Sequence, residues 1–191
     1  LDEFRIAHIA DQILALKTKG VQVVLVVSGA VACGASSIDL SSGDSELKQI
    51  AAGIGQAYLT STFQQVFFLK HLVIAQILLT KDTLNSRNQK ERIAQLLHRY
   101  LQVGIIPVIN ENDVIDLNSF GGNDLLSAEV SMLINVDKLV ILSTMEGSIY
   151  GVGGGATKQE ALAILQKQNI NANILNGKTK KIFKLYCRNN D

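Results

Sequence analysis

The sequence predicts an α/β fold in which helices cover both faces of one open, mainly parallel sheet. Apolar residues make up 47% of the chain, yet aromatic residues contribute only 5% and Trp is absent. A core built from Ile, Leu, Val and Ala is typical of buried parallel strands. In addition, short β-branched runs alternate with longer segments of helical periodicity, which is the pattern of right-handed crossovers between parallel strands.

The expected elements follow one another along the whole chain. Residues 2–19 have helical spacing, and Gly20 is a suitable stop. The further expected elements are a strand at 21–27, a helix at 46–70, a strand at 72–79, a helix at 82–103 ended by Gly104, a strand at 105–109, a polar loop at 110–122, a helix at 124–136 and a strand at 138–143.

Length and charge narrow the class of protein. The 191 residues suit one domain, and the formal net charge of +1 provides no broad attraction for nucleic acid or an anionic membrane. No apolar run reaches the roughly 18 residues that cross a bilayer, so we expect a cytoplasmic protein. Cys33 and Cys187 lie far apart, and the three His residues are scattered, so no metal-ligand set is expected from them.

Polar residues follow the apolar strands at four places. These strand ends are Ser28-Gly29, Thr80-Lys81, residues 110–113 and Ser143-Thr144. Ligands of open α/β sheets bind at the carboxyl ends of the strands. The sequence therefore predicts a ligand site at this edge of the sheet.

Two glycine-containing segments are candidate ligand sites, and for each a purely structural turn is an alternative. In GVGGGATK, residues 151–158, backbone N–H groups at a helix N-terminus would bind phosphate, although a plain flexible turn is equally compatible with the string. Ser28 and Gly29 would let a ligand approach the backbone, whereas the alternative is a tight strand-to-helix turn with Ser28 as N-cap.

A cluster of amides and carboxylates is the third candidate feature. It comprises INEND at 109–113 and FGGND at 120–124. Such a cluster suits the ammonium and carboxylate groups of an amino acid, and the alternative is a solvated turn. A carboxylate substrate is already ionised at neutral pH, so phosphoryl transfer to it requires alignment and cations rather than a general base.

Seven segments together resemble the glutamate 5-kinases of the amino-acid-kinase superfamily. In chain order they are VVSGAVACGA, KQIAAGIGQAYL, QILLT, NSRN, PVINENDVI, GGNDLLSA and GGGATK. The resemblance implies a three-layer α/β/α sandwich, with glutamate bound by residues 1–136 and ATP by residues 137–191. It also implies ATP-dependent formation of γ-glutamyl phosphate on the route to proline.

The resemblance implies a role for each matching position. Glutamate would be bound by Ser28, Gly29, Asn110, Asp113 and Asn123. Asp124 would orient the catalytic Lys158, and ATP would contact Ser143, Thr144, Val152, Gly153, Gly154, Gly155, Ala156, Thr157 and Lys158. Mg²⁺ would be held mainly through the ATP phosphates, proline is a candidate feedback ligand, and a homo-oligomer (dimer or tetramer) is expected.

The chain also departs from the family pattern. A carboxylate is expected where Gly122 stands, and a Thr-Asp pair where Ser143-Thr144 stands. A first lysine-bearing strand and a segment between Tyr150 and Gly151 are expected to be missing from this chain. Two alternatives therefore stay open: another carboxylate kinase of the superfamily acting on acetylglutamate or aspartate, and a catalytically silent amino-acid-binding subunit.

Overall fold

The computed structural model describes residues 1–143 and 154–179. The chain forms two compact units, Leu1–Phe120 and Gly121–Asp191, and each is described by itself. The boundary lies after Phe120, whereas the sequence placed the change from the glutamate part to the ATP part near residue 136. Residues 121–124 of the FGGND segment and the helix that follows Gly122 thus belong to the second unit.

The elements alternate between helix and strand as expected. The first unit contains α1 (Glu3–Lys17), β1 (Leu25–Val26), α2 (Ala30–Gly34), the short 3-10 helix η1 (Ala35–Ser37), α3 (Ser45–Phe68), β2 (Ile74–Leu79), α4 (Lys81–Asn85), α5 (Arg87–Gln102) and β3 (Ile106–Glu111). The second contains α6 (Asn123–Leu133), β4 (Lys138–Ser143), α7 (Gly154–Lys167) and β5 (Asn171–Asn176).

All the described strand pairs are parallel, which confirms the α/β fold class. In the first unit the strand order is β1-β3-β2, with Val26 opposite Ile109 and Leu79 opposite Glu111. In the second unit β4 pairs with β5. The described strands thus form two hydrogen-bonded sheets, one in each unit, where the sequence suggested one.

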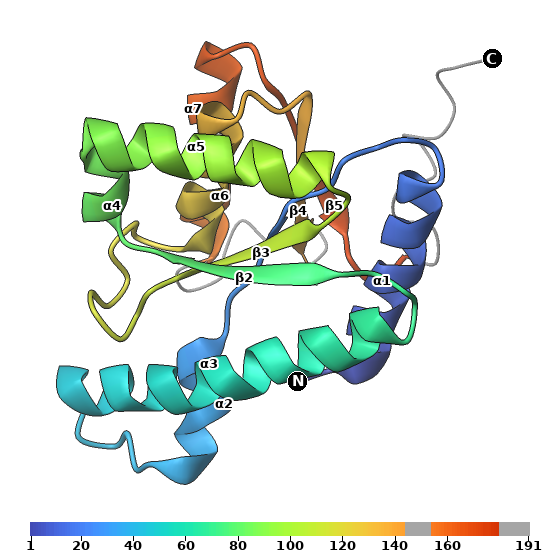
Figure 1. The fold of residues 1–191 in the computed structure, drawn as a ribbon. Helices are drawn as coiled ribbons and strands as arrows, with labels where there is room; N and C mark the ends of the chain where they lie inside the picture. Colours follow the sequence, from blue (N-terminus) through green and yellow to red (C-terminus); the bar gives the residue numbers. More distant parts are fainter. Residues whose placement is uncertain (144–153, 180–191) are drawn as a thin grey trace. The chain divides into compact units, whose positions relative to one another are not determined.

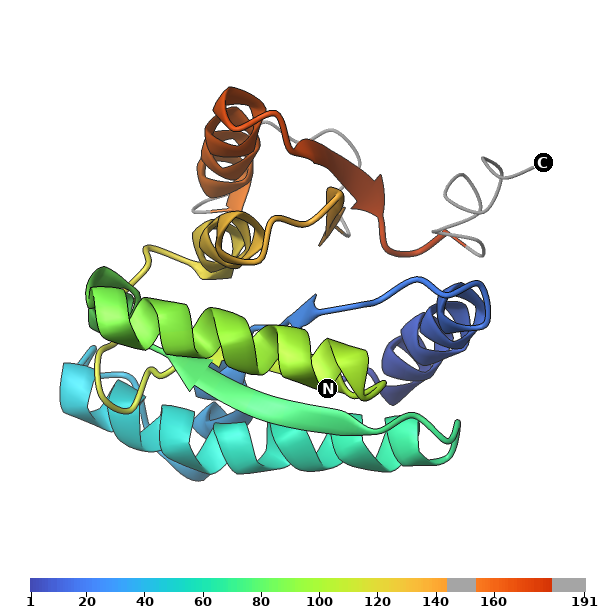
Figure 2. The ribbon, with the colours of Figure 1, turned by 45° about the horizontal axis from the view of Figure 1, so that its top comes forward.

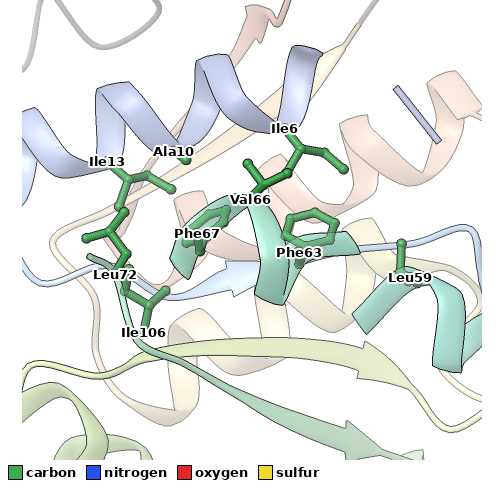
Figure 3. Close-up of a cluster of buried hydrophobic side chains, with 9 residues drawn as sticks. All are labelled: Ile6, Ala10, Ile13, Leu59, Phe63, Val66, Phe67, Leu72 and Ile106. Atoms are coloured by element: carbon green, nitrogen blue, oxygen red, sulfur yellow. The ribbon is translucent and has the colours of Figure 1, made fainter. Parts of the chain in front are cut away.

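Helices cover both faces of the sheet of the first unit. Figures 1 and 2 show α3 on one side of β2 and β3 and α5 on the other. Helix α1 packs beside α3, and their apolar faces meet the start of the sheet in the cluster drawn in Figure 3. The members of this cluster are Ile6, Ala10, Ile13, Leu59, Phe63, Val66, Phe67, Leu72 and Ile106. Burying these side chains drives the association of both helices with the sheet.

Helix α1 has defined signals at both ends. Asp2 is its N-cap, and the backbone N–H of Arg5 donates to the Asp2 carboxylate at 3.0 Å, which lowers the pKa of that carboxyl below its ordinary value. At the other end Gly20 takes φ +80°, and the N–H of Val21 donates to the carbonyl of Leu16 at 3.1 Å. Val21 therefore terminates α1 instead of beginning a strand.

The structure differs from the sequence-based prediction in four main respects. Strand β1 covers only Leu25–Val26, not residues 21–27. The helix expected at 82–103 is divided by Ser86, whose extended backbone (φ −75°, ψ 114°) separates α4 from α5. Strand β3 continues through Asn110 and Glu111, which were expected in a loop, and β5 was not predicted.

The contact between α2 and α3 is made by backbone. A Cβ atom built on Gly55 of α3 would lie 1.8 Å from the carbonyl oxygen of Ala30, and one on Gly34 would lie 1.9 Å from the carbonyl oxygen of Ala51. No side chain fits at either position. The small residues of KQIAAGIGQ therefore bring the two helices together at a distance that larger residues would prevent.

Gly55→Ala should lower the free energy of unfolding by about 3 kcal/mol, because the new methyl group would overlap the Ala30 carbonyl and force the helices apart. Gly53→Ala is the matched control on the same helix, since its Cβ would meet Val114 Cγ2 at an ordinary 3.5 Å. This control should gain stability by about 0.5 kcal/mol from helix propensity. Urea denaturation measures both, and equal effects of the two variants would contradict this view of the contact.

Within the described residues, no helix is both long enough and apolar enough to cross a membrane.

Candidate active site

The carboxyl end of β3 carries two buried polar side chains. Asn110 is 1% exposed and Glu111 is 2% exposed. The Asn110 Nδ2 donates to Gln56 Oε1 of α3 at 2.8 Å, and Glu111 Oε2 accepts from the backbone N–H of Phe120 at 3.4 Å. These hydrogen bonds offset part of the cost of burying the two groups.

Ser28 and Gly29 lie at the same edge of the sheet. The N–H of Val27 donates to the carbonyl of Ile109 at 2.9 Å, so the turn after β1 begins beside the residues that end β3. Gly29, at φ +106°, is the N-cap of α2. The alternative with Ser28 as N-cap is therefore wrong, and the positive φ explains why glycine stands at position 29.

Asp113 begins the loop that follows β3. Its Oδ1 accepts from the backbone N–H of Asn118 at 3.0 Å, which folds the loop back on itself. Gln49 of α3 donates through Nε2 to the Val114 carbonyl at 3.0 Å and ties the loop to the helix. A small hollow opens here and is lined by Ala30, Ala52, Gln56, Leu78, Glu111, Asn112, Asp113 and Val114.

In the second unit, Asn123 and Asp124 begin α6. They follow Gly121 and Gly122, whose φ values of +80° and +128° are favourable for glycine alone. With ψ at 154°, Gly122 occupies a region that residues with a Cβ avoid. The backbone conformation thus explains why glycine stands where the family resemblance suggested a carboxylate.

Asp124 joins α6 to α7 through two side chains. Lys158 Nζ donates to Asp124 Oδ2 at 2.7 Å, and Thr157 Oγ1 donates to the same oxygen at 3.1 Å. Lys158 and Thr157 lie near the start of α7, where backbone N–H groups favour anions. The structure therefore brings together the two residues predicted to be catalytic, beside a helix N-terminus.

The glycine-rich string differs from expectation in one respect. Gly154, Gly155 and Ala156 belong to α7, so the helix begins within the string and not after Lys158. The expected ATP contacts at Thr144, Val152 and Gly153 lie outside the described residues. The plain flexible turn is consequently not the conformation of residues 154–158.

Ser143 ends β4 opposite Asn176, the last residue of β5. The carbonyl of Ser143 accepts from the N–H of Gly177 at 2.9 Å. The position of Asn176 at this strand end was missed because β5 was not predicted. Gln56 was also missed: it is a polar residue among the buried positions of α3, but nothing near it in the sequence marks its partner Asn110.

The predicted site residues thus fall into two groups. Ser28, Gly29, Asn110 and Asp113 belong to the first unit, while Asn123, Asp124, Ser143 and residues 154–158 belong to the second. Across residues 1–143 and 154–179 the structure contains no cluster of three or more His, Cys, Asp or Glu residues able to hold a metal ion. Fold and site together define an α/β protein with polar groups at parallel strand ends and a lysine–carboxylate pair at a helix start.

The chain belongs to the amino acid kinase family, whose sequence model matches residues 2–150. Curated relatives agree. The chain is 31% identical over 221 aligned positions to a protein named glutamate 5-kinase of Clostridium acetobutylicum, covering 96% of this chain and 83% of the relative. It is 36% identical to glutamate 5-kinase 2 of Bacillus subtilis, covering 89% of this chain and 46% of that protein.

A third relative, glutamate 5-kinase of Trichlorobacter lovleyi, is 42% identical over 153 residues, with 77% of this chain and 40% of the relative covered. The chain therefore spans most of the clostridial protein but less than half of the other two. Membership in the family confirms the resemblance drawn from the seven segments.

Gly122→Asp should destabilise the protein by about 1–3 kcal/mol, because aspartate would be forced into φ +128° and ψ 154°. Thermal unfolding measures this directly. Asn118→Asp is the control, since Asn118 already holds φ +56° in the left-handed region that Asp tolerates. An unchanged melting temperature for Gly122→Asp would show that position 122 is free to accept the carboxylate of the family pattern.

Proposed function

We propose that this protein transfers the γ-phosphoryl group of ATP to the side-chain carboxylate of L-glutamate and forms γ-glutamyl phosphate, the first step toward proline. The observation that carries the proposal is the Lys158–Asp124 pair at the start of α7, in a chain similar over most of its length to curated glutamate 5-kinases. Family membership supplies the reaction class, and the pair supplies a cation for the phosphoryl group.

In the proposed reaction a carboxylate oxygen of glutamate forms a bond to the γ-phosphorus while the bond to the ADP oxygen breaks. Negative charge spreads over the phosphoryl oxygens during transfer. Lys158 would stabilise that charge, and Asp124, held 2.7 Å from the lysine nitrogen, would aim the ammonium group. The substrate carboxylate needs no proton removed, so a general base is not required.

Recognition of glutamate is assigned to the edge of the sheet in the first unit. Asn110 presents a buried amide, and Asp113 offers a carboxylate for the substrate ammonium group. Ser28 and Gly29 give backbone and hydroxyl groups at a turn that leaves room for a ligand. The role of Asn123, which lies in the second unit, stays a prediction from the family resemblance.

ATP contacts are proposed at Ser143 and along residues 154–158, where the start of α7 and Lys158 suit phosphate groups. Mg²⁺, when bound with ATP, neutralises phosphate charge. We assign it to the nucleotide phosphates, as the family resemblance implies. Proline feedback and homo-oligomer assembly stay predictions from the resemblance, and a cytoplasmic location stays a prediction from the sequence.

An internal segment missing near residue 150 is part of the same proposal. The alignment with the C. acetobutylicum protein runs over 221 positions, more than the 191 residues of this chain. The family model ends its match at residue 150. Both facts support the proposal that the clostridial relative has, inside the aligned region, a segment that this chain lacks.

A substrate panel tests the proposed activity. ADP formation should depend on glutamate, with N-acetylglutamate and aspartate giving about 10²-fold lower kcat/KM, because a site that pairs polar groups of one substrate discriminates strongly against another. Turnover of acetylglutamate or aspartate without glutamate would replace this assignment by another carboxylate kinase. Glutamate or proline binding without any ADP formation would favour the silent amino-acid-binding subunit.

Lys158→Ala should lower kcat about 10²-fold or more, with a smaller change in the glutamate KM, because the lysine acts on charge that develops during transfer. Lys167→Ala is the matched control, since this lysine lies in the last turn of the same helix. Steady-state kinetics and thermal unfolding of both variants provide the comparison. An unchanged kcat for Lys158→Ala would remove this residue from the mechanism.

Asp113→Ala and Asn123→Ala should each raise the glutamate KM much more than the ATP KM, because both side chains are assigned to the amino acid and not to the nucleotide. Asp116→Ala is the control for loop disorder, as it lies in the same exposed loop. If a variant raised the glutamate KM and the ATP KM equally, its effect would come from disorder of the loop or of the helix start, and the residue would have no specific role in glutamate recognition.

A further inference from the structure

Four uncharged polar side chains form a continuous hydrogen-bonded row in the first unit. Asn110 Nδ2 of β3 donates to Gln56 Oε1 of α3 at 2.8 Å. Gln56 Nε2 then donates to Thr60 Oγ1, one helical turn further, at 3.0 Å. The Thr60 hydroxyl donates in turn to Gln76 Oε1 on β2. The row therefore runs from a buried strand end to an exposed position on the edge strand.

The hydrogen bonds of this row all point in one direction. Thr60 has one hydroxyl hydrogen and gives it to Gln76, so it must accept from Gln56. Gln56 donates to Thr60 through its NH₂ group and turns its carbonyl oxygen toward Asn110, whose NH₂ group donates to it. Consequently Asn110 turns its NH₂ group toward α3, and its Oδ1 takes no part in the row.

The remaining oxygen of Asn110 is the unusual feature. Asn110 is 99% buried, and its Oδ1 has no hydrogen-bond partner among the described residues. Buried acceptors without a donor are rare and costly in folded proteins. Asn110 is bonded to Gln56, which lines the hollow, and it follows Ile109, whose carbonyl accepts from the residue before the Ser28–Gly29 turn. A ligand that brings an N–H donor would satisfy the Asn110 oxygen.

We propose that Gln56 and Thr60 are positioning residues for amino-acid recognition: they orient the amide of Asn110 so that its oxygen, and not its NH₂ group, receives the substrate ammonium group. This inference rests on the proposed function, which assigns Asn110 to glutamate. It adds Gln56 and Thr60 of α3 to the proposed glutamate site, as residues that act on Asn110 and do not touch the substrate. Gln76 ends the row at the surface, where its Oε1 accepts from Thr60.

The competing explanation is purely structural. The same four residues connect α3 to the sheet, so removing one of them could lower stability without any effect on recognition. The two explanations separate in the kinetics, because a misoriented Asn110 weakens glutamate binding while ATP binding and kcat stay intact. Loss of helix packing would instead lower the melting temperature and leave the glutamate KM of the folded fraction unchanged.

The first test compares Thr60→Val with Thr60→Ser. Valine keeps the shape and removes the hydroxyl, whereas serine keeps the hydroxyl. Thr60→Val should raise the glutamate KM about three- to tenfold, the effect of one ordinary hydrogen bond, while kcat and the ATP KM change less than about twofold. Thr60→Ser should restore the wild-type value. Equal KM values for Val, Ser and wild type would overturn the proposal.

A double-mutant cycle with Asn110→Ala shows whether Thr60 acts through Asn110. The rise in glutamate KM caused by Thr60→Val should disappear when Asn110 is already Ala. The same fold-change in both backgrounds would contradict the relay, because Thr60 would then act independently of Asn110.

The exposed end of the row permits a test that leaves the core intact. Gln76→Glu keeps an acceptor for Thr60 and should leave the glutamate KM near the wild-type value. Gln76→Lys offers only donors, so Thr60 must accept from it and donate to Gln56, which reverses the row and raises the glutamate KM several-fold. If the charge at position 76 acted only by attracting or repelling anionic glutamate, Gln76→Lys would have the lower glutamate KM and Gln76→Glu the higher one. The opposite order, or no difference, would overturn the proposal.

The substrate panel, measured on the wild-type protein, distinguishes failure of this inference from failure of the proposed function. If the wild-type protein turns over aspartate and not glutamate, the proposed function is wrong. The Thr60 and Gln76 variants are then measured on aspartate, which carries the same ammonium group. A selective rise in its KM would support the relay, and none would overturn it.

Discussion

The direct backbone contact between α2 and α3 is the constraint on which the first unit depends. Gly55 has no room for a Cβ beside the Ala30 carbonyl, so α2 is held against α3 and the turn at Gly29 is fixed at the end of β1. Gln56 follows Gly55 directly and meets Asn110 at the end of β3. One close contact thus aligns the small-residue turn with the buried amide at the neighbouring strand end, and binding groups on a rigid sheet edge need this kind of support.

The second unit has an apolar core formed by Ala128, Ile141, Ala161, Leu165 and Ile170, and a charged pair joins the starts of its two helices. Asp124 lies in the first turn of α6, where a carboxylate is favourable, and it accepts hydrogen bonds from Thr157 and Lys158 of α7. A lysine held by one carboxylate is restrained in position yet keeps further N–H donors for a ligand. The glycine at 122 gives α6 its entry angle through a backbone conformation that other residues avoid. In our account this arrangement prepares the cation for a phosphoryl group before the substrate arrives.

Much of the fold could be predicted from hydrophobic patterning and glycine stops, as β4 and the end of α1 before Gly20 illustrate. The errors have physical causes. Asn110 and Glu111 were assigned to a loop because polar residues rarely end a buried strand, but backbone pairing with β2 and side-chain partners keep them in β3. The Asp124–Lys158 pair was placed by family resemblance. Gln56 was missed because its partner is 54 positions away in sequence, and neither periodicity nor a local motif records such a contact.

The central claim is that the carboxylate of glutamate, and no other group, receives the phosphoryl group. Hydroxylamine tests it directly, because it reacts with an acyl phosphate to give a hydroxamate and does not react with a phosphate ester under the same mild conditions. With protein, MgATP and glutamate, we expect γ-glutamyl hydroxamate to accumulate in a one-to-one ratio with ADP. ADP formed without hydroxamate, or no glutamate-dependent ADP at all, would contradict the account.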